Sequence, residues 1–203
     1  MNNDTQIPQP NYRSGTRPVF RLSEAGLTVG TSVMTPNGQI SVEELKGGDR
    51  VLTKDHGYQQ VRCIAFRDVD LTQNEDQAPI RLRADCIGHE RPVSDLFLAP
   101  NQRIAMRHPM FDLMFGAREV VARAGDLTHL AGVDQMQGLR GITYVMLGFR
   151  RPQMVFTGSL VLDLGASDGP PPRPVLSSEE AKLACSMLAP APASHLEIGV
   201  PLH

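Results

Sequence analysis

Cysteine and histidine are the most reactive side chains in this sequence, and their spacing shows which chemistry they could support. The chain has three cysteines, Cys63, Cys86 and Cys185, and six histidines. The cysteines stand far apart, with no Cys-x-x-Cys pair and no histidine at ligand spacing, which argues against a zinc site or a disulfide framework. We expect buried or merely tolerated thiols, no bound metal and no cofactor.

Two pairs of a histidine and an acidic residue are candidates for a metal site. His89 precedes Glu90, and Asp112 follows four residues after His108. Pro109 would interrupt any helix that placed His108 and Asp112 on one face. We interpret these histidines as surface or half-buried polar residues rather than as metal ligands.

Arginines gather in the middle of a chain that is otherwise nearly neutral, with 20 Lys and Arg against 22 Asp and Glu. This balance argues against a broad nucleic-acid surface. Two interpretations of the local cluster stay open: a groove for an anionic partner, or strand edges where arginine prevents aggregation. The basic residues are Arg81, Arg83, Arg91, Arg103, Arg107, His108, Arg150 and Arg151.

An apolar run occupies residues 106–115, where only Arg107 and Asp112 carry a formal charge. It is either an adhesive loop that faces a protein partner or a segment that covers the core. In the first interpretation the binding residues are Met106, Met110, Phe111, Met114 and Phe115.

Length and composition indicate one domain with tails. The 203 residues are 41% hydrophobic and 21% charged, which is enough to bury a core. No apolar run approaches the roughly 18 residues of a membrane span, and residues 1–18 lack the apolar core of a secretory signal. We therefore expect a cytoplasmic protein that is not bound to a membrane.

Proline divides the chain into three parts, because ten of the 16 prolines lie in the first 20 residues or after Ser167. We expect a flexible leader at 1–20, a β domain at 21–167, and a Pro-rich spacer, short helix and tail at 168–203. Consecutive prolines in the spacer forbid a helix there. Ser177 and Glu180 then form the capping-box pattern of a helix that runs to about Met187.

Many short apolar alternations separated by turn signals predict an all-β fold for the central region. Residues 36–38, Pro-Asn-Gly, predict a tight turn. Residues 119–127 are the helical candidate inside this region, or a loop with a helical turn, and 141–149 with 154–157 predict a late hairpin. The other expected strands are 31–35, 50–53, 59–66, 79–82, 95–99 and 102–106.

Six blocks of the central region carry a family resemblance. They read GLTVGTSVMTPNG at 26–38, VEEL at 42–45, GDRVLT at 48–53, QVR at 60–62, DLFLAPNQR at 95–103 and ITYVM at 142–146. In this order they resemble the Hint (Hedgehog/intein) module, in the bacterial branch found in alpha-proteobacterial proteins. The resemblance spans about residues 25–166. It implies a horseshoe of twisted antiparallel strands with two pseudo-twofold subdomains.

The resemblance also implies self-processing chemistry. In the family, a nucleophile at the first position attacks the preceding peptide carbonyl, and a hydroxyl and histidines polarise that peptide and move the proton. The matching positions in this sequence are Gly26 for the nucleophile, Ala99 for the hydroxyl, and Gln102 and Met146 for the histidines. None of these side chains is a nucleophile or titrates near pH 7. We expect a degenerate site with no intact catalytic residue.

Three hypotheses for the function follow. The first is a Hint pseudo-enzyme that no longer self-processes and is retained as a binding or scaffold module for an unidentified protein. The second is active autoprocessing through an unrecognised nucleophile, such as Thr28, Thr31, Cys63 or Cys86. The third is an unrelated β-rich protein that binds a ligand or nucleic acid.

Overall fold

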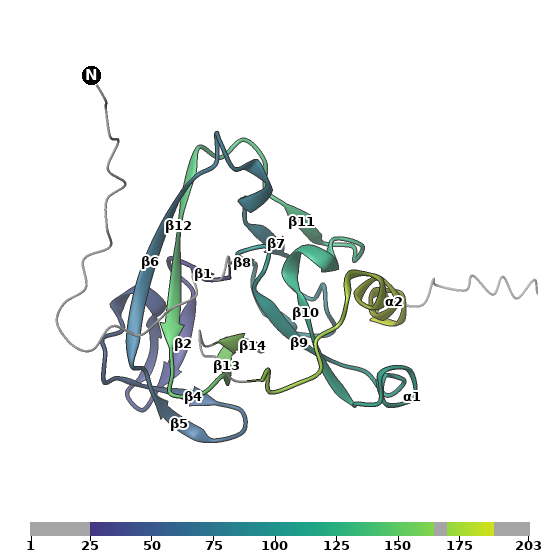
Figure 1. Ribbon diagram of the computed structural model, residues 1–203, viewed down its shortest axis with the longest axis horizontal. Helices are drawn as coiled ribbons and strands as arrows, with labels where there is room; N and C mark the ends of the chain where they lie inside the picture. The colour runs from purple at the N-terminus through teal and green to yellow at the C-terminus, as the bar shows by residue number, and fades with distance from the viewer. Residues whose placement is uncertain (1–24, 165–169, 189–203) are drawn as a thin grey trace, which may run out of the picture.

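The computed structural model describes residues 25–164 and 170–188, and the regular secondary structure of this part of the chain is mostly antiparallel strand (Figure 1). It forms two six-stranded sheets and one two-stranded hairpin. The all-β class predicted from the sequence is confirmed. No helix of the described residues is long and apolar enough to cross a membrane.

Both large sheets combine strands from distant parts of the chain. The first has the order β11 (Val133–Gln135), β7 (Ile80–Leu82), β8 (Leu96–Leu98), β1 (Leu27–Thr28), β12 (Gly141–Gly148) and β6 (Cys63–Asp70). The second has the order β10 (Glu119–Arg123), β9 (Arg103–Arg107), β14 (Leu160–Leu164), β13 (Gln153–Thr157), β4 (Arg50–Thr53) and β5 (Gly57–Gln60).

The remaining elements are short. The hairpin consists of β2 (Ser32–Thr35) and β3 (Gly38–Ser41), and its turn lies at the predicted Pro-Asn-Gly site. Gly38 has φ +108°, which a glycine adopts without strain. The two α-helices are α1 (Phe111–Phe115) and α2 (Ser178–Leu188), and 3₁₀ turns occupy Val42–Glu44, Glu75–Gln77 and Ala124–Leu127.

Alternation of apolar side chains explains why the second sheet forms. In β9, Ile104 and Met106 are buried while their neighbours are not, and in β14 Leu160, Leu162 and Leu164 repeat this period of two. Successive side chains of a strand point to opposite faces. These residues therefore form one apolar face that belongs to the main core of the protein.

Three predictions about individual elements are wrong. Residues 141–149 and 154–157 form no hairpin, because β12 pairs with β6 and β1 whereas β13 pairs with β14 and β4 in the other sheet. Residues 59–66 are not one strand, since the chain leaves β5 and crosses to β6 at positions 61–62. The helical candidate at 119–127 is strand β10 followed by a 3₁₀ turn, because Val120 and Val121 are buried in pairing with β9.

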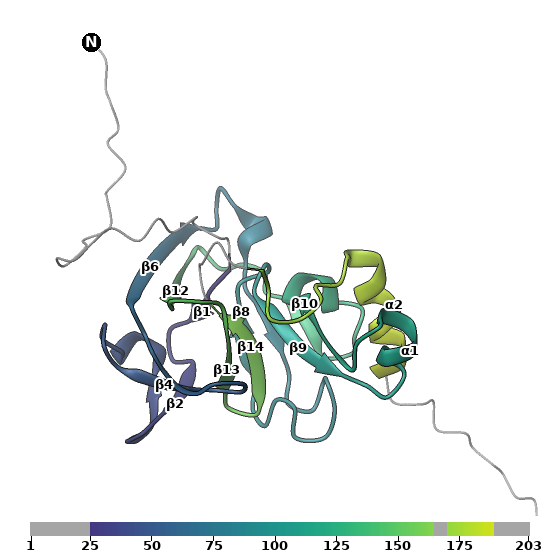
Figure 2. The ribbon, with the colours of Figure 1, turned by 60° about the horizontal axis from the view of Figure 1, so that its bottom comes forward.

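The described part of the C-terminal segment packs onto the β domain. The N–H of Val121 donates to the carbonyl of Pro174, and the N–H of Leu176 donates to the carbonyl of Val121, both at 2.9 Å. These bonds attach the segment to the outer edge of β10. Helix α2 follows and buries Ala181, Ala184 and Cys185, and α1 and α2 lie at the same end of the molecule in Figures 1 and 2.

The predicted capping box at the start of α2 is confirmed. The Ser177 hydroxyl and backbone N–H both donate to Glu180 Oε2 at 2.8 Å, and the Glu180 N–H donates back to Ser177 Oγ at 3.3 Å. These bonds satisfy backbone donors that a helix start otherwise leaves open. The predicted leader at 1–20 and the tail beyond residue 188 lie outside the described residues.

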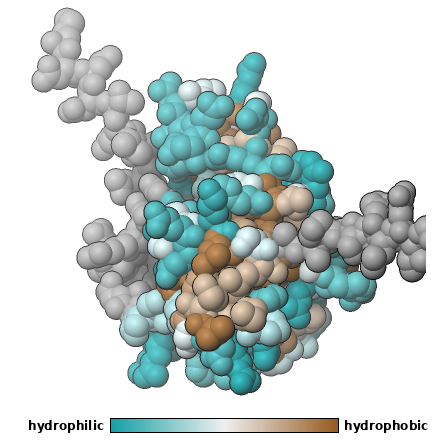
Figure 3. Space-filling model, turned by 90° about the vertical axis from the view of Figure 1, so that its right-hand side faces the viewer, coloured by the Kyte–Doolittle hydropathy of each residue, from teal (hydrophilic) through white to brown (hydrophobic). Residues whose placement is uncertain are grey.

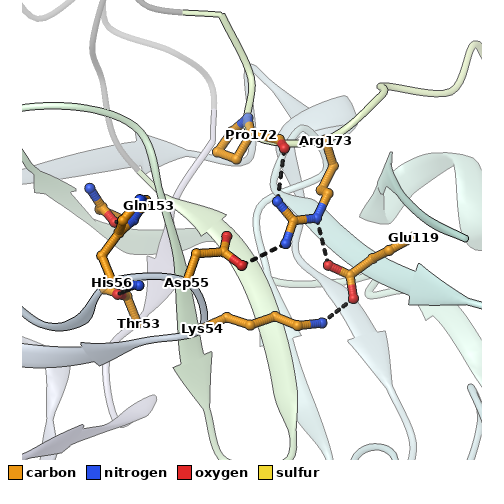
Figure 4. A network of polar contacts seen from close by, with 8 residues as sticks. All are labelled: Thr53, Lys54, Asp55, His56, Glu119, Gln153, Pro172 and Arg173. Carbon is orange, nitrogen blue, oxygen red and sulfur yellow. Dashed lines mark hydrogen bonds and ion pairs between the residues drawn. The ribbon is translucent and has the colours of Figure 1, made fainter. Parts of the chain in front are cut away.

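An ion-pair network also holds this segment, through Arg173 (Figure 4). The Arg173 guanidinium donates to Glu119 Oε1 at 2.8 Å and to Asp55 Oδ1 at 2.7 Å. Glu119 also forms an ion pair with Lys54. Burial raises the pKa of Glu119, but the hydrogen bonds and charges of Lys54 and Arg173 outweigh this effect, so its pKa lies below the ordinary value.

The substitution Glu119→Gln tests this network through its pH dependence. A lowered native pKa stabilises the fold at a pH above the unfolded value of 4.5, and this stabilisation is lost as the pH falls through the native pKa. We expect Glu119→Gln to reduce the free energy of unfolding by about 1–2 kcal/mol at pH 7 and by much less at pH 3. The measurement is urea unfolding at both pH values.

The matched control for this experiment is Glu44→Gln, because Glu44 is exposed and has no ion pair within the described residues. We expect this variant to differ little from the unmodified protein at either pH. A loss for Glu119→Gln that stayed constant between pH 7 and pH 3 would contradict the network.

Candidate functional site

Three segments meet where the resemblance predicts the site: the start of β1, the end of β8 and the middle of β12. Leu27 pairs with Val145 on one side and with Leu98 on the other. The Ala99 N–H donates to the Gly26 carbonyl at 3.0 Å, and the Gln102 N–H donates to the Ala99 carbonyl at 2.9 Å. Backbone bonds therefore connect three of the four predicted positions directly.

Gly26 lies against β12 at a distance that leaves no room for a side chain. A Cβ built on Gly26 would stand 2.9 Å from Tyr144 Cβ and 3.6 Å from Met146 Cγ. The φ angle of Gly26 is +153°, which side chains of L-residues rarely adopt. Met146, the fourth predicted position, thus belongs to the same cluster, and the four predicted site residues lie together.

Tyr144 is a further residue of this site, and no motif in the sequence had indicated it as a site residue. Its side chain is fully buried, its hydroxyl donates to the Gln77 carbonyl at 2.7 Å, and the Arg67 guanidinium lies 4.9 Å from its ring centroid. Burial raises the pKa of Tyr144 well above its ordinary value, although Arg67 acts in the opposite direction. The phenol is therefore a neutral, fixed group that holds the β12 side of the site in position.

The Gln102 side chain is engaged with the backbone. It is 1% exposed, and its Nε2 donates to the carbonyls of Arg103 and Asp163 at 3.1 and 2.9 Å. The neighbouring Asp163 carboxylate is buried and stands 2.9 Å from Arg103 Nη1. Burial raises the pKa of Asp163 in spite of Arg103. In this arrangement the Gln102 side chain bridges β9 and β14.

The cysteines are unlike activated nucleophiles. Burial raises the pKa of Cys63, and it raises the pKa of Cys86 and of Cys185 to about 11, with nearby aspartates adding to the effect. A thiol reacts as its thiolate, so these groups are almost wholly in the unreactive form at neutral pH. Cys185 is buried, whereas Cys63 and Cys86 are half-buried.

The two threonines near the start of β1 are also engaged. Thr28 Oγ1 donates to the Phe97 carbonyl at 2.9 Å and lies 3.4 Å from Thr31 Oγ1. Both residues are buried. The described residues contain no group of three or more His, Cys, Asp or Glu side chains that could hold a metal ion.

The apolar run divides into a buried and an exposed part. Met106 and Phe111 are 2% and 0% exposed and belong to the core, which removes them from any surface that a partner could touch. Phe115 is half-buried against the same core. Met110 and Met114, each 45% exposed, remain accessible.

The exposed part belongs to an apolar patch on the side that carries α1 and α2 (Figure 3). Leu113, which is 77% exposed, and Leu183 of α2 are further exposed apolar residues there. We call Met110, Leu113, Met114 and Leu183 the α1–α2 patch.

The arginines of the predicted basic cluster fall into two groups, those that form ion pairs and those that line a cavity. Arg81 and Arg83 form ion pairs with Asp134, and Arg103 forms one with Asp163. A separate cavity of about 530 Å³ is lined by Arg91, Arg107, His108, Pro109, Asp112 and Arg118.

The close approach of Gly26 to β12 predicts an unequal response to the same substitution at two glycines. Gly26→Ala is expected to reduce the free energy of unfolding by about 3 kcal/mol, since the new methyl group meets Tyr144. Gly30 also has a positive φ, +87°, but a Cβ there meets nothing within 4 Å. We expect Gly30→Ala to cost only about 1 kcal/mol, and equal losses in urea unfolding would contradict the contact.

The family model of the Hint domain matches residues 25–162. No curated protein sequence matches the chain significantly.

Solved structures with a similar fold include inteins. The gp41-1 intein is 10% identical and covers 70% of this chain and 100% of its own, with a TM-score of 0.41. The MchDnaB-1 intein is 9% identical and covers 68% and 98%, with a TM-score of 0.46. The bacterial intein-like domain from Clostridium thermocellum is 11% identical and covers 68% and 97%, with a TM-score of 0.44.

The family match extends over most of the described β domain, from the residue before Gly26 to the middle of β14. Its limits leave the segment at 170–188, with Arg173 and α2, outside the matched region. The chain belongs to the Hint domain family.

Proposed function

We propose that this protein is a Hint domain that does not cleave or splice its own backbone and that serves as a binding or scaffold module for another protein. The observation that carries the proposal is the contact of Gly26 with β12. At the position where the family's reaction needs a nucleophile, a Cβ would stand only 2.9 Å from Tyr144 Cβ, which is closer than real Cβ contacts, while Met146 Cγ would lie in ordinary contact at 3.6 Å.

The acyl shift of the family requires groups that this site does not offer. A nucleophile must attack the preceding carbonyl, and a base must accept its proton. Gly26 and Ala99 have no functional group, Met146 is a weak acceptor only, and the Gln102 amide cannot exchange a proton near neutral pH. Since Gln102 Nε2 already donates to two backbone carbonyls, it is not free to polarise a peptide bond.

Substitute nucleophiles have little support. Thr28 would attack a different peptide bond, and its hydroxyl hydrogen is used in the bond to the Phe97 carbonyl. Cys86 and Cys185 have pKa values raised to about 11. Cys63 is held as a thiol by the same effect of burial. An acyl shift at any of these residues would also require a base within hydrogen-bond distance of the nucleophile.

The α1–α2 patch supports the binding role. Met110, Leu113 and Met114 come from the turn before α1 and from α1 itself, and Leu183 comes from α2. Methionine adapts its shape to different apolar surfaces, and contiguous exposed apolar residues often mark protein interaction sites. Arg107, His108 and Arg118 of the adjacent cavity provide a polar rim, as is common around such surfaces.

The absence of self-processing is tested by intact-protein mass spectrometry. The purified chain is incubated for days with and without dithiothreitol or hydroxylamine, which intercept a thioester or an ester. We expect one unchanged full-length mass in all samples, because no nucleophile stands at position 26. A urea-unfolded sample incubated in parallel reports background hydrolysis.

Two results of this experiment would overturn the proposal. Fragments that divide between Ala25 and Gly26 would show that the family reaction still proceeds. Fragments that divide at Thr28 or Cys63 would identify a substitute nucleophile. In either case the fragments must form faster than in the unfolded control.

The α1–α2 patch is tested with an apolar fluorescent dye, 8-anilinonaphthalene-1-sulfonate. We expect the double variant Leu113→Ser and Met114→Ser to bind less dye while unfolding at nearly the same urea concentration, since both side chains are exposed. The matched control is Val29→Ser with Val93→Ser, two apolar residues that are 51% and 67% exposed elsewhere. Equal dye binding by both double variants would contradict a continuous apolar patch.

A further inference from the structure

A second basic cavity lies where the chain crosses between the two large sheets. It has a volume of about 380 Å³ and is lined by His56, Gln59, Gln60, Arg62, Phe149, Arg150, Arg151 and Gln153. Arg62 belongs to the crossing from β5 to β6, and Arg150 and Arg151 belong to the crossing from β12 to β13. The two crossings lie side by side, since the Arg62 N–H donates to the Gly148 carbonyl at 2.7 Å.

The charges of this cavity have one sign. Three arginines are among its lining residues, and no lining residue carries a carboxylate. Within residues 25–164 and 170–188, neither Arg62, Arg150 nor Arg151 forms an ion pair. Asp55, which directly precedes the lining residue His56, has its carboxylate bound to Arg173.

Several other arginines of the described residues face a carboxylate. Arg81, Arg83, Arg103 and Arg173 each face an aspartate or glutamate, and the larger cavity beside α1 includes Asp112 next to Arg118. Like charges gathered in one cavity repel one another, and an anion relieves that repulsion. The cavity at the crossing is therefore the stronger candidate for an anionic ligand.

The neutral wall of the cavity is held in place by its own hydrogen bonds. Gln153 is 6% exposed, and its Oε1 lies 3.0 Å from His56 Nδ1. Because an amide oxygen only accepts, Nδ1 carries the hydrogen and Nε2 of His56 is left for other partners. Gln59 Nε2 donates to the His56 carbonyl at 2.6 Å, and Gln60 Nε2 donates to the Gly48 carbonyl at 3.3 Å. Each amide nitrogen keeps a second hydrogen, so the wall offers preorganised donors.

We propose that this cavity binds the phosphoryl group of a small ligand. Guanidinium groups present planar pairs of N–H donors that match the oxygens of a phosphate. The volume lies within the range of about 300–1,000 Å³ that is common for small-molecule sites, and it exceeds what a single ion needs. This proposal does not depend on the α1–α2 patch or on whether the site at Gly26 is catalytically inactive.

The test is calorimetric titration of the whole chain with pyrophosphate. We expect Arg150→Gln with Arg151→Gln to weaken binding about tenfold or more, because each charge-assisted hydrogen bond contributes strongly. Arg62→Gln alone, from the other crossing, is expected to weaken binding severalfold. All three arginines are exposed, so we expect the variants to unfold at the same urea concentration as the unmodified protein.

The matched control removes two positive charges elsewhere, through Arg123→Gln with Arg140→Gln, which are also exposed. We expect this variant to bind pyrophosphate as the unmodified protein does. Equal weakening in both double variants, or no binding of pyrophosphate by the unmodified protein, would overturn the proposal.

A single-stranded oligonucleotide is titrated in parallel, at low and at physiological ionic strength. Binding of pyrophosphate that persists at the higher ionic strength, with the oligonucleotide bound more weakly, is the expected result. Tighter binding of the oligonucleotide with a steep dependence on salt would assign the arginines to a nucleic-acid backbone instead and would overturn the small-ligand proposal.

Discussion

The pairing of β12 with β6 and β1 is the constraint on which the candidate site depends. β12 pairs with β6 along its whole length, and on its other side Val145 and Tyr144 pair with Leu27 and Thr28. This register places Tyr144 Cβ directly beside Gly26. Because the Tyr144 hydroxyl is bonded to Gln77 and its ring lies under Arg67, the side chain cannot move aside without breaking buried contacts.

Gly26 therefore differs from the family's first residue in two ways: it has no nucleophile, and its lack of a side chain allows β1 to pack closely against β12. In the proposed account, the backbone of β1 has closed onto β12 in the space where the family's chemistry takes place. A reactive side chain restored at position 26 alone would collide with Tyr144 Cβ. The same account explains why the neighbouring polar groups, Gln102 and Thr28, are engaged with backbone carbonyls.

Local features of the sequence predicted local structure well. The Pro-Asn-Gly turn, the capping box of α2 and strands such as β4 and β9 follow from residue types within a few positions. The prediction of a late hairpin was wrong because β12 pairs with β6, which lies far away along the chain. A pattern of alternation shows that a strand forms but not which strand it pairs with.

The same limit applies to the site. The family blocks identified Gly26, Ala99, Gln102 and Met146 as one group, and the structure brings them together. The role of Tyr144 could not be predicted, because it arises from sheet register and from the φ angle of Gly26. The burial of Met106 and Phe111 was equally hidden, since an apolar run fits both a core and a surface.

The most direct test of the central claim is to restore the reactive groups together. In one variant, Gly26→Cys is combined with Ala99→Thr, Gln102→His and Met146→His, and its mass is followed in the presence of thiol along with its urea unfolding. We expect a destabilised chain that stays at full length, since Tyr144 leaves no room for the new side chain. A variant as stable as the unmodified protein that undergoes thiol-dependent cleavage before residue 26 would contradict it.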